Sequence, residues 1–157
     1  MPPNLPYFAL EVNKANTCCH RRKIFVHNES STNCICLRKY NMGVNKDLLL
    51  MLTSSGLGEG EPDLGEKLLG AFLNVLFENG DIPARIICMN SGIFLTTEGS
   101  YAEETLRKFE QAGSEILSCG TCLDYYNRKD KLIIGQASNM KETVNAMLAF
   151  SKVLSPR

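Results

Sequence analysis

The sequence lacks a long hydrophobic segment. No apolar run approaches the roughly 18–20 residues that a membrane-spanning helix needs, and the N-terminus has no apolar stretch of the kind found in a signal peptide. Cysteine is too scarce for a disulfide scaffold, because the 157 residues contain seven. A domain of this size buries enough surface to fold without disulfides. We therefore expect a reduced, cytoplasmic protein.

Net charge is also absent, but the charges are unevenly distributed along the chain. Seventeen lysines and arginines balance seventeen aspartates and glutamates. Residues 1–46 hold seven basic and two acidic side chains, so their net charge is +5 and that of residues 47–157 is −5. This asymmetry predicts two parts. One is a basic, cysteine-containing arm or truncated N-terminal segment over residues 1–46, and the other is an α/β domain over residues 47–157.

The basic arm shows no helical periodicity. Its apolar runs at 23–27 and 34–37 predict either a β-hairpin or a partly ordered arm. The arm lacks the aromatic interleaving and the motifs typical of nucleic-acid binding, so we do not expect a nucleic-acid partner. Four of the seven cysteines lie in it, namely Cys18, Cys19, Cys34 and Cys36.

Residues 47–157 alternate short apolar runs with amphipathic segments. Apolar runs at 48–52, 84–89, 115–118 and 131–135 predict strands, and residues 93–96 either extend the sheet or begin a loop. Capping pairs predict the starts of the three longer helices. These pairs are Asp63 with Glu66, Ser100 with Glu103, and Asn139 with Glu142. Gly113 is expected to end the second helix, and the last helix is expected to reach Val153. Strands alternating with helices predict a three-layer α/β sandwich with a parallel or mostly parallel sheet.

The strongest chemical signal is Cys119-Gly120-Thr121-Cys122. It lies where the third predicted strand ends and a short helix begins, and ligands gather at the carboxyl ends of strands in an open α/β sheet. Free N–H groups at a helix start favour the thiolate, which is the nucleophilic form of cysteine. Two such thiols support a relay, in which one takes a sulfur atom and the other resolves it as a disulfide.

Other interpretations of the cysteines stay open. The CxxC pair also fits two small buried residues, or a thioredoxin-like oxidoreductase, although the redox motif usually follows the first strand. The cysteines of the arm have the wrong spacings for a zinc site, so no metal is expected. Cys88 ends the second predicted strand and is expected in the core. The loop 56–62 matches neither a GxGxxG motif nor a P-loop, so no nucleotide cofactor is expected.

Several stretches occur in an order that a known family shares. They are Leu57-Gly58-Glu59-Gly60, Asn90-Ser91-Gly92, Thr97-Glu98-Gly99-Ser100, the run from Glu115 to Tyr126 and Ser138-Asn139-Met140. With them, residues 47 to about 154 resemble the C-terminal domain of YedF-type proteins linked to selenium metabolism, within the DsrE-like sulfur-relay family. YedF-type proteins usually begin with a TusA-like domain that carries a Cys-Pro-x-Pro motif. This chain has no such motif, and residues 1–46 are too few for that domain.

The resemblance implies a DsrE-like α/β sandwich with sulfurtransferase-like activity. Cys119 would accept sulfane sulfur as a persulfide and pass it to an acceptor thiol, with Cys122 able to discharge it. The expected binding positions around the pair are Gly120, Thr121 and Tyr125, with Ser55 and Asn90 after the first two strands. Donor and acceptor proteins, TusA-like ones among them, would act in trans, and the family commonly forms homo- or hetero-oligomers. The alternative functions are a non-catalytic assembly or binding module with structural cysteines, or a thioredoxin-like reductase.

Overall fold

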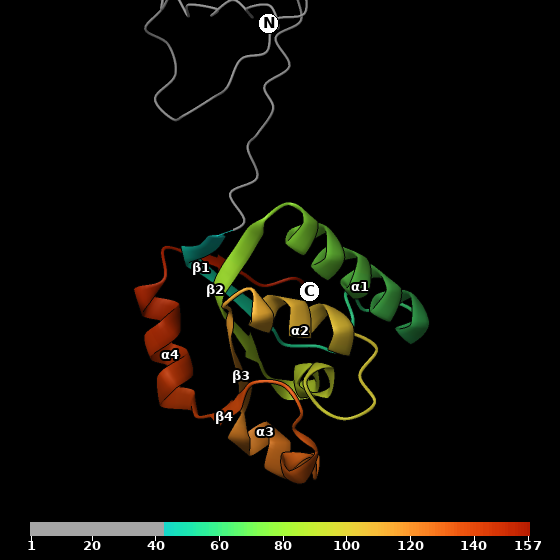
Figure 1. Ribbon diagram of the computed structural model, residues 1–157. Coiled ribbons are helices and arrows are strands. Elements are labelled where there is room, and N and C mark those ends of the chain that lie inside the picture. The colour runs from blue at the N-terminus through green and yellow to red at the C-terminus, as the bar shows by residue number, and fades with distance from the viewer. Residues whose placement is uncertain (1–42) are drawn as a thin grey trace, which may run out of the picture. The chain divides into compact units, whose positions relative to one another are not determined.

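The computed structural model describes residues 43–157, which form a single sheet with helices on both faces (Figure 1). Its strands are β1 (Gly43–Leu52), β2 (Asp81–Cys88), β3 (Glu115–Cys119), β4 (Gln136–Ser138) and β5 (Lys152–Leu154). The strand order is β4-β3-β2-β1-β5, and every neighbouring pair is parallel. The arm predicted for residues 1–46, with its cysteines, lies outside the described residues except for positions 43–46.

Helices connect successive strands and lie on both faces of this sheet. They are α1 (Pro62–Glu78), α2 (Glu103–Gln111), α3 (Gly120–Tyr125) and α4 (Met140–Ala149), with short 3₁₀ segments η1 (Asn90–Leu95) and η2 (Lys129–Lys131). Figure 1 shows α4 on the opposite side of the sheet from α1 and α2. Within residues 43–157, no helix is long and apolar enough to cross a membrane.

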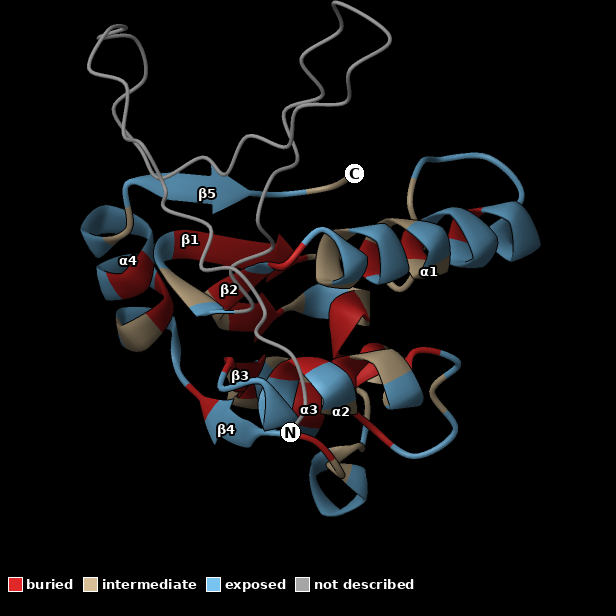
Figure 2. Ribbon diagram, turned by 45° about the horizontal axis from the view of Figure 1, so that its top comes forward, coloured by how far each residue is buried: buried red, intermediate tan, exposed pale blue. Residues whose placement is uncertain are grey.

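Alternate residues along the strands supply two separate apolar clusters. On one face, Leu50, Ile86 and Ile116 pack with the apolar sides of α1 and α2. On the other, Leu49 and Ile87 pack against α4. Each fully buried side chain of this size contributes about 1.5–3 kcal/mol to folding. Figure 2 shows the result, with the central strands largely buried between helices whose outer sides are exposed, and with the edge strands β4 and β5 mostly exposed. The predicted α/β sandwich is confirmed, with a sheet that is parallel throughout.

The fourth predicted strand, over residues 131–135, is wrong. The amides of Ile133 and Ile134 donate to the carbonyl of Thr96, at 3.0 and 3.2 Å, instead of joining the sheet. Ile134 is buried, so the apolar run packs in the core without forming a strand. Gly135 then turns the chain with a φ of +69°, where a Cβ would lie 2.2 Å from the Ile116 carbonyl oxygen. The strand begins one residue later, as β4.

The end of the last predicted helix is also wrong. The helix α4 stops at Ala149, and Phe150 already has an extended backbone. Val153 is therefore not helical but pairs with Leu49 in β5, a fifth strand that the sequence did not predict. Residues 93–96, for which a strand or a loop was expected, lie in and just after the 3₁₀ segment η1 instead.

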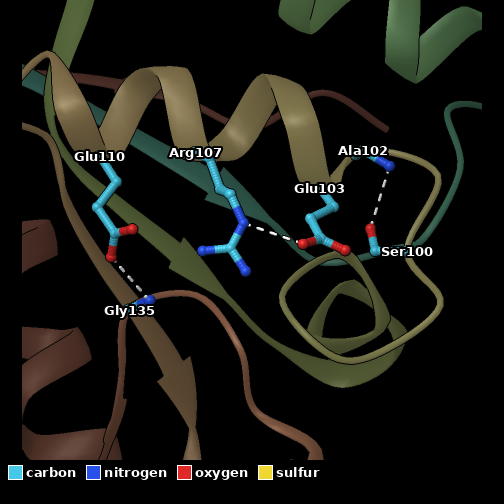
Figure 3. Close-up of polar contacts among 6 residues, drawn as sticks. All are labelled: Ser100, Ala102, Glu103, Arg107, Glu110 and Gly135. Atoms are coloured by element: carbon cyan, nitrogen blue, oxygen red, sulfur yellow. Dashed lines mark hydrogen bonds and ion pairs between the residues drawn. The ribbon is translucent and has the colours of Figure 1, made fainter.

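Of the three predicted helix caps, one is confirmed and two are wrong. Asn139 caps α4 as predicted, because its Oδ1 accepts from the amide of Glu142 at 3.0 Å. The pair at α2 is wrong: the Ser100 Oγ accepts from the amide of Ala102 at 3.1 Å, and the Glu103 carboxylate accepts from Arg107 (Figure 3).

The pair predicted at α1 is wrong as well. The helix begins at Pro62, so Asp63 lies inside the first turn, and Glu61 occupies the N-cap position without a side-chain cap bond. The predicted end of α2 is confirmed at Gly113, whose φ is +102° and whose amide donates to the carbonyl of Glu110. Such positive φ angles favour glycine because it has no Cβ.

Candidate functional site

The candidate site lies at the carboxyl edge of the three central strands. The register places Leu52 of β1 opposite Cys88 of β2, and Cys88 opposite Ser118 of β3. The residues that follow each strand therefore emerge at the same level of the sheet. This is the edge at which open α/β sheets bind their ligands.

Cys119 and Cys122 occupy the end of β3 and the first turn of α3. Cys119 is the last residue of the strand and is 5% exposed, whereas Cys122 is partly exposed. Both are free thiols, three residues apart across the strand end and the helix start. The predicted position of the CxxC motif, across a strand end and a helix start, is confirmed.

Gly120 lets the chain turn tightly from strand to helix. A Cβ at this position would lie 3.1 Å from the backbone oxygen of Ser138, so a larger residue would push α3 away from β4. Thr121 is exposed on the outer side of the turn. The glycine and the threonine thus shape the backbone around the thiols, and no side-chain hydrogen bond from Thr121 to either sulfur is recorded.

Asn90 brings the loop after β2 onto the cysteine pair. Its backbone amide donates to the Cys122 Sγ at 3.2 Å, and its side-chain Oδ1 accepts from the Tyr126 hydroxyl at 3.1 Å. Asn90 has a φ of +49°, a left-handed conformation that asparagine tolerates better than most residues. Of the binding residues predicted after the first two strands, Asn90 is the one that contacts a cysteine.

The surroundings of Cys122 act on its pKa in opposite directions. Burial raises the pKa, as does the contact with Cys119, while the hydrogen bond from the Asn90 amide lowers it. The net effect is a pKa above the ordinary value for cysteine. Cys88 is different: complete burial raises its pKa to about 12, which confirms its predicted place in the core.

Ser55 lies beside the pair rather than on it. Its amide donates to the Ser91 Oγ at 3.3 Å, and its carbonyl accepts from the Tyr101 hydroxyl at 2.7 Å. Gly92 permits this approach, because a Cβ there would lie 2.1 Å from the Leu52 carbonyl oxygen. The loop after β1 is thereby tied to the loop after β2, one residue from Asn90.

A row of aromatic rings borders the site on the α3 side. Tyr125 and Tyr126 meet edge to face with their centroids 5.0 Å apart, and Tyr126 meets Phe94 at the same centroid distance. The Arg128 guanidinium lies 5.0 Å from the Phe94 ring centroid. Tyr125, a predicted binding residue, points outward with 79% of its surface exposed.

The sequence prediction did not include Tyr126 among the site residues. Its spacing from Cys122 could have identified it. Residues four apart lie on the same side of a helix, so Tyr126 lies one turn after Cys122 and on the same side. The role of Asn90 depends on a backbone amide in a left-handed conformation, which the identity of the residue alone does not reveal.

Two hollows of the surface lie away from the cysteine pair. One of about 580 Å³ lies between the sheet and α4, where Arg85 and Asn139 contribute to its lining. Another, of about 540 Å³, lies against α1 and includes Tyr101. Within residues 43–157, no group of three or more His, Cys, Asp or Glu side chains is arranged to hold a metal ion.

Comparison with known proteins supports the fold. No protein-family model and no curated protein sequence matches the chain. Among solved structures, the YchN protein of E. coli matches with a TM-score of 0.51 and 18% identity, over 71% of this chain and 99% of that one. The protein of unknown function MTH1491 from Methanobacterium thermoautotrophicum matches with a TM-score of 0.52 and 13% identity, over 71% of this chain and 100% of that one. At these identities the likeness concerns the fold, and the chain has the YchN-like DsrE fold that the sequence resemblance implied.

Proposed function

We propose that this protein is a sulfane-sulfur carrier, in which the Cys119–Cys122 pair takes sulfur from a donor persulfide and passes it to an acceptor thiol. The observation that carries the proposal is the pair itself: two free thiols at the carboxyl edge of a parallel sheet, one buried and one partly exposed. The DsrE-like resemblance supports the same chemistry. No cofactor is needed for it.

The different exposures of the thiols suggest separate roles. Cys122 is the more accessible, so its thiolate attacks the outer sulfur of the donor persulfide. The sulfur–sulfur bond of the donor breaks, the donor leaves as a thiolate, and a Cys122 persulfide forms. The Cys119 thiolate then attacks the same outer sulfur, which frees the Cys122 thiolate and leaves the persulfide on Cys119. There, burial shields it from stray thiols.

Release follows the same steps in reverse. An acceptor thiolate attacks the outer sulfur after its return to Cys122, and Cys122 leaves as a thiolate. When no acceptor arrives for a long time, the Cys122 thiolate slowly attacks the inner sulfur of the Cys119 persulfide. That reaction expels hydrosulfide and leaves a Cys119–Cys122 disulfide, so the pair discharges without an external oxidant.

Loading with a small persulfide donor, followed by intact mass spectrometry, tests the proposal. The wild-type protein should gain the mass of one sulfur atom at the pair. Cys119→Ser should still load, but lose the sulfur faster, while Cys122→Ser should load slowly. If the variant that lacks both thiols loads as well as wild type, the carrier function is refuted. The cysteines of residues 1–42 are the source of such background loading, so the comparison controls for them.

A binding module without sulfur chemistry is the second candidate. The 5% exposure of Cys119 favours it, because a structural cysteine is usually buried. This function predicts that neither Cys119 nor Cys122 is alkylated appreciably in the native protein. Rapid native alkylation of Cys122 would exclude it.

Self-association belongs to the same proposal. The helix α4 exposes a continuous apolar side, and the neighbouring strand β5 is exposed as well. The exposed apolar residues of α4 are Met140, Val144, Met147 and Leu148. They recur at helical spacing, and such a stripe on a surface marks an interaction face. A homo-oligomer whose interface buries α4 would leave the cysteine edge of the sheet open to sulfur donors and acceptors.

A further inference from the structure

A chain of two hydrogen bonds starts at Tyr126 and ends on the sulfur of Cys122. The Tyr126 hydroxyl donates to the Asn90 Oδ1 at 3.1 Å, and the Asn90 amide donates to the Cys122 Sγ at 3.2 Å. Tyr126 and Cys122 are one helical turn apart, and the Tyr126 amide donates to the Cys122 carbonyl. The loop after β2 is therefore fastened to α3 at two neighbouring points, through a single residue.

The backbone around Asn90 is held in place from both sides. The preceding residue, Met89, donates its amide to the Leu52 carbonyl at 2.9 Å, and the Gly92 amide donates to the Met89 carbonyl. Asn90 itself adopts φ = +49°, and its amide donates to Cys122. A left-handed residue needs compensation for its strain. The bond from the Tyr126 hydroxyl to the Asn90 side chain supplies it.

The charged groups near α3 are engaged elsewhere. Asp124 pairs with Lys129 at 3.2 Å, and the Arg128 guanidinium lies over the Phe94 ring while donating to the carbonyl of Glu98. The titratable group in contact with Cys122 is Cys119, from β3, and it disfavours a second negative charge. Among the described residues, the amide of Asn90 is thus the hydrogen-bond donor that favours the thiolate of Cys122.

We infer that Tyr126 is a positioning residue, which acts through Asn90 to stabilise the thiolate of Cys122 and so sets how readily this thiol reacts. The inference rests on the proposed function for the sulfur-transfer role of Cys122. Its physical content, the reactivity of one thiol, is measurable without any sulfur donor. Loss of the Tyr126 hydroxyl should loosen the Asn90 amide and disfavour the thiolate, while the ring keeps its contact with Phe94.

The test compares Tyr126→Phe with Tyr125→Phe in the full chain. The Tyr125 ring is adjacent and mostly exposed, and no hydrogen bond of its hydroxyl is recorded, so it is a matched control. Alkylation by iodoacetamide is followed at Cys122 across pH by tandem mass spectrometry of the tryptic peptide 109–128. Tyr126→Phe should raise the pH midpoint of alkylation by about half a unit to one unit, and slow the reaction at neutral pH about three- to tenfold. Tyr125→Phe should match wild type.

Asn90→Gly gives a second test, which distinguishes a positioning role of Tyr126 from a purely structural one. Glycine adopts a positive φ without a Cβ, so the loop keeps its course but loses the acceptor for Tyr126. Asn90→Gly should raise the midpoint, and the double variant with Tyr126→Phe should show no further rise. Equal midpoints in wild type and Tyr126→Phe, or additive shifts in the double variant, would overturn the inference. These outcomes do not depend on sulfur loading, so a failure of the carrier function would be recognised separately.

Discussion

At the scale of single residues, burial divides the three described cysteines into two kinds. Cys88 has no exposed surface and belongs to the core, whereas Cys119 and Cys122 lie at the sheet edge in contact with each other. Burial keeps the Cys88 thiol neutral by raising its pKa to about 12. Burial raises the pKa of Cys122 as well, and the hydrogen bond from the Asn90 amide opposes that rise.

The raised pKa of Cys88 predicts a pH dependence of stability. In the unfolded chain this thiol ionises near its ordinary pKa of 9.0, while in the folded protein it stays neutral until about pH 12. The neutral thiol therefore favours folding below pH 9, and this contribution is lost as the pH rises toward 12. The loss between pH 8 and pH 10 should be about 1.4 kcal/mol of unfolding free energy.

Urea unfolding of wild type and Cys88→Ala at both pH values measures this loss. The alanine variant lacks the ionising group but keeps every other cysteine, so its stability should fall less between pH 8 and pH 10. The constant cost of the smaller side chain cancels in the comparison. Equal falls in the two proteins would show that Cys88 ionises in the native state.

At the scale of secondary-structure elements, predictability follows the strength of the hydrophobic pattern. The second half of β1, residues 48–52, and most of β2 and β3 are buried and appear in the sequence as short apolar runs, whereas residues 43–47 at the start of β1 are polar and were not predicted. The edge strands β4 and β5 have three residues each and mostly exposed side chains, so they carry no comparable signal. The apolar run that suggested a strand at 131–135 packs in the core beside Thr96 instead.

The candidate site divides in the same way. The CxxC motif was visible in the sequence because two thiols at that spacing are chemically distinctive. The contact of Asn90 with Cys122 was not, since it depends on a left-handed backbone and on a tyrosine from another element. Neither the conformation nor the pairing follows from local residue preferences.

The cap of α4 offers a test at the element scale. Asn139 accepts the amide of Glu142, while Asn145 lies exposed in the middle of the same helix. Asn139→Ala should lower the free energy of unfolding by about 1 kcal/mol, because an N-terminal amide loses its acceptor. Asn145→Ala should change it by less than about 0.5 kcal/mol. Chemical denaturation of the two variants decides the point, and equal losses would mean that the cap bond contributes nothing.

At the scale of the whole molecule, the two faces of the sheet are covered differently. Within residues 43–157, one face carries α1 and α2 over the larger apolar cluster, and the other carries α4 over a smaller one. The outer side of α4 is rich in exposed apolar residues, among them Leu148 with 81% of its surface exposed. The proposed homo-oligomer would therefore bury the α4 face.

Leu148→Glu should shift the protein toward the monomer in light scattering, because a charge in an apolar interface must be desolvated. Leu64→Glu places the same charge on α1, at a leucine that is 53% exposed, and should leave the oligomeric state unchanged. Both substitutions are at exposed sites and should fold. A wild-type protein that is already monomeric at high concentration would contradict the assignment of the α4 face.

The location of the carried sulfur tests the central claim most directly. The protein is incubated with a small persulfide donor, freed of it, and digested with trypsin, and each cysteine-containing peptide is weighed. The added sulfur should lie on peptide 109–128, which holds Cys119 and Cys122, and should disappear when an acceptor thiol is supplied. Sulfur found only on the cysteines of residues 1–42, or none at all, would contradict the account.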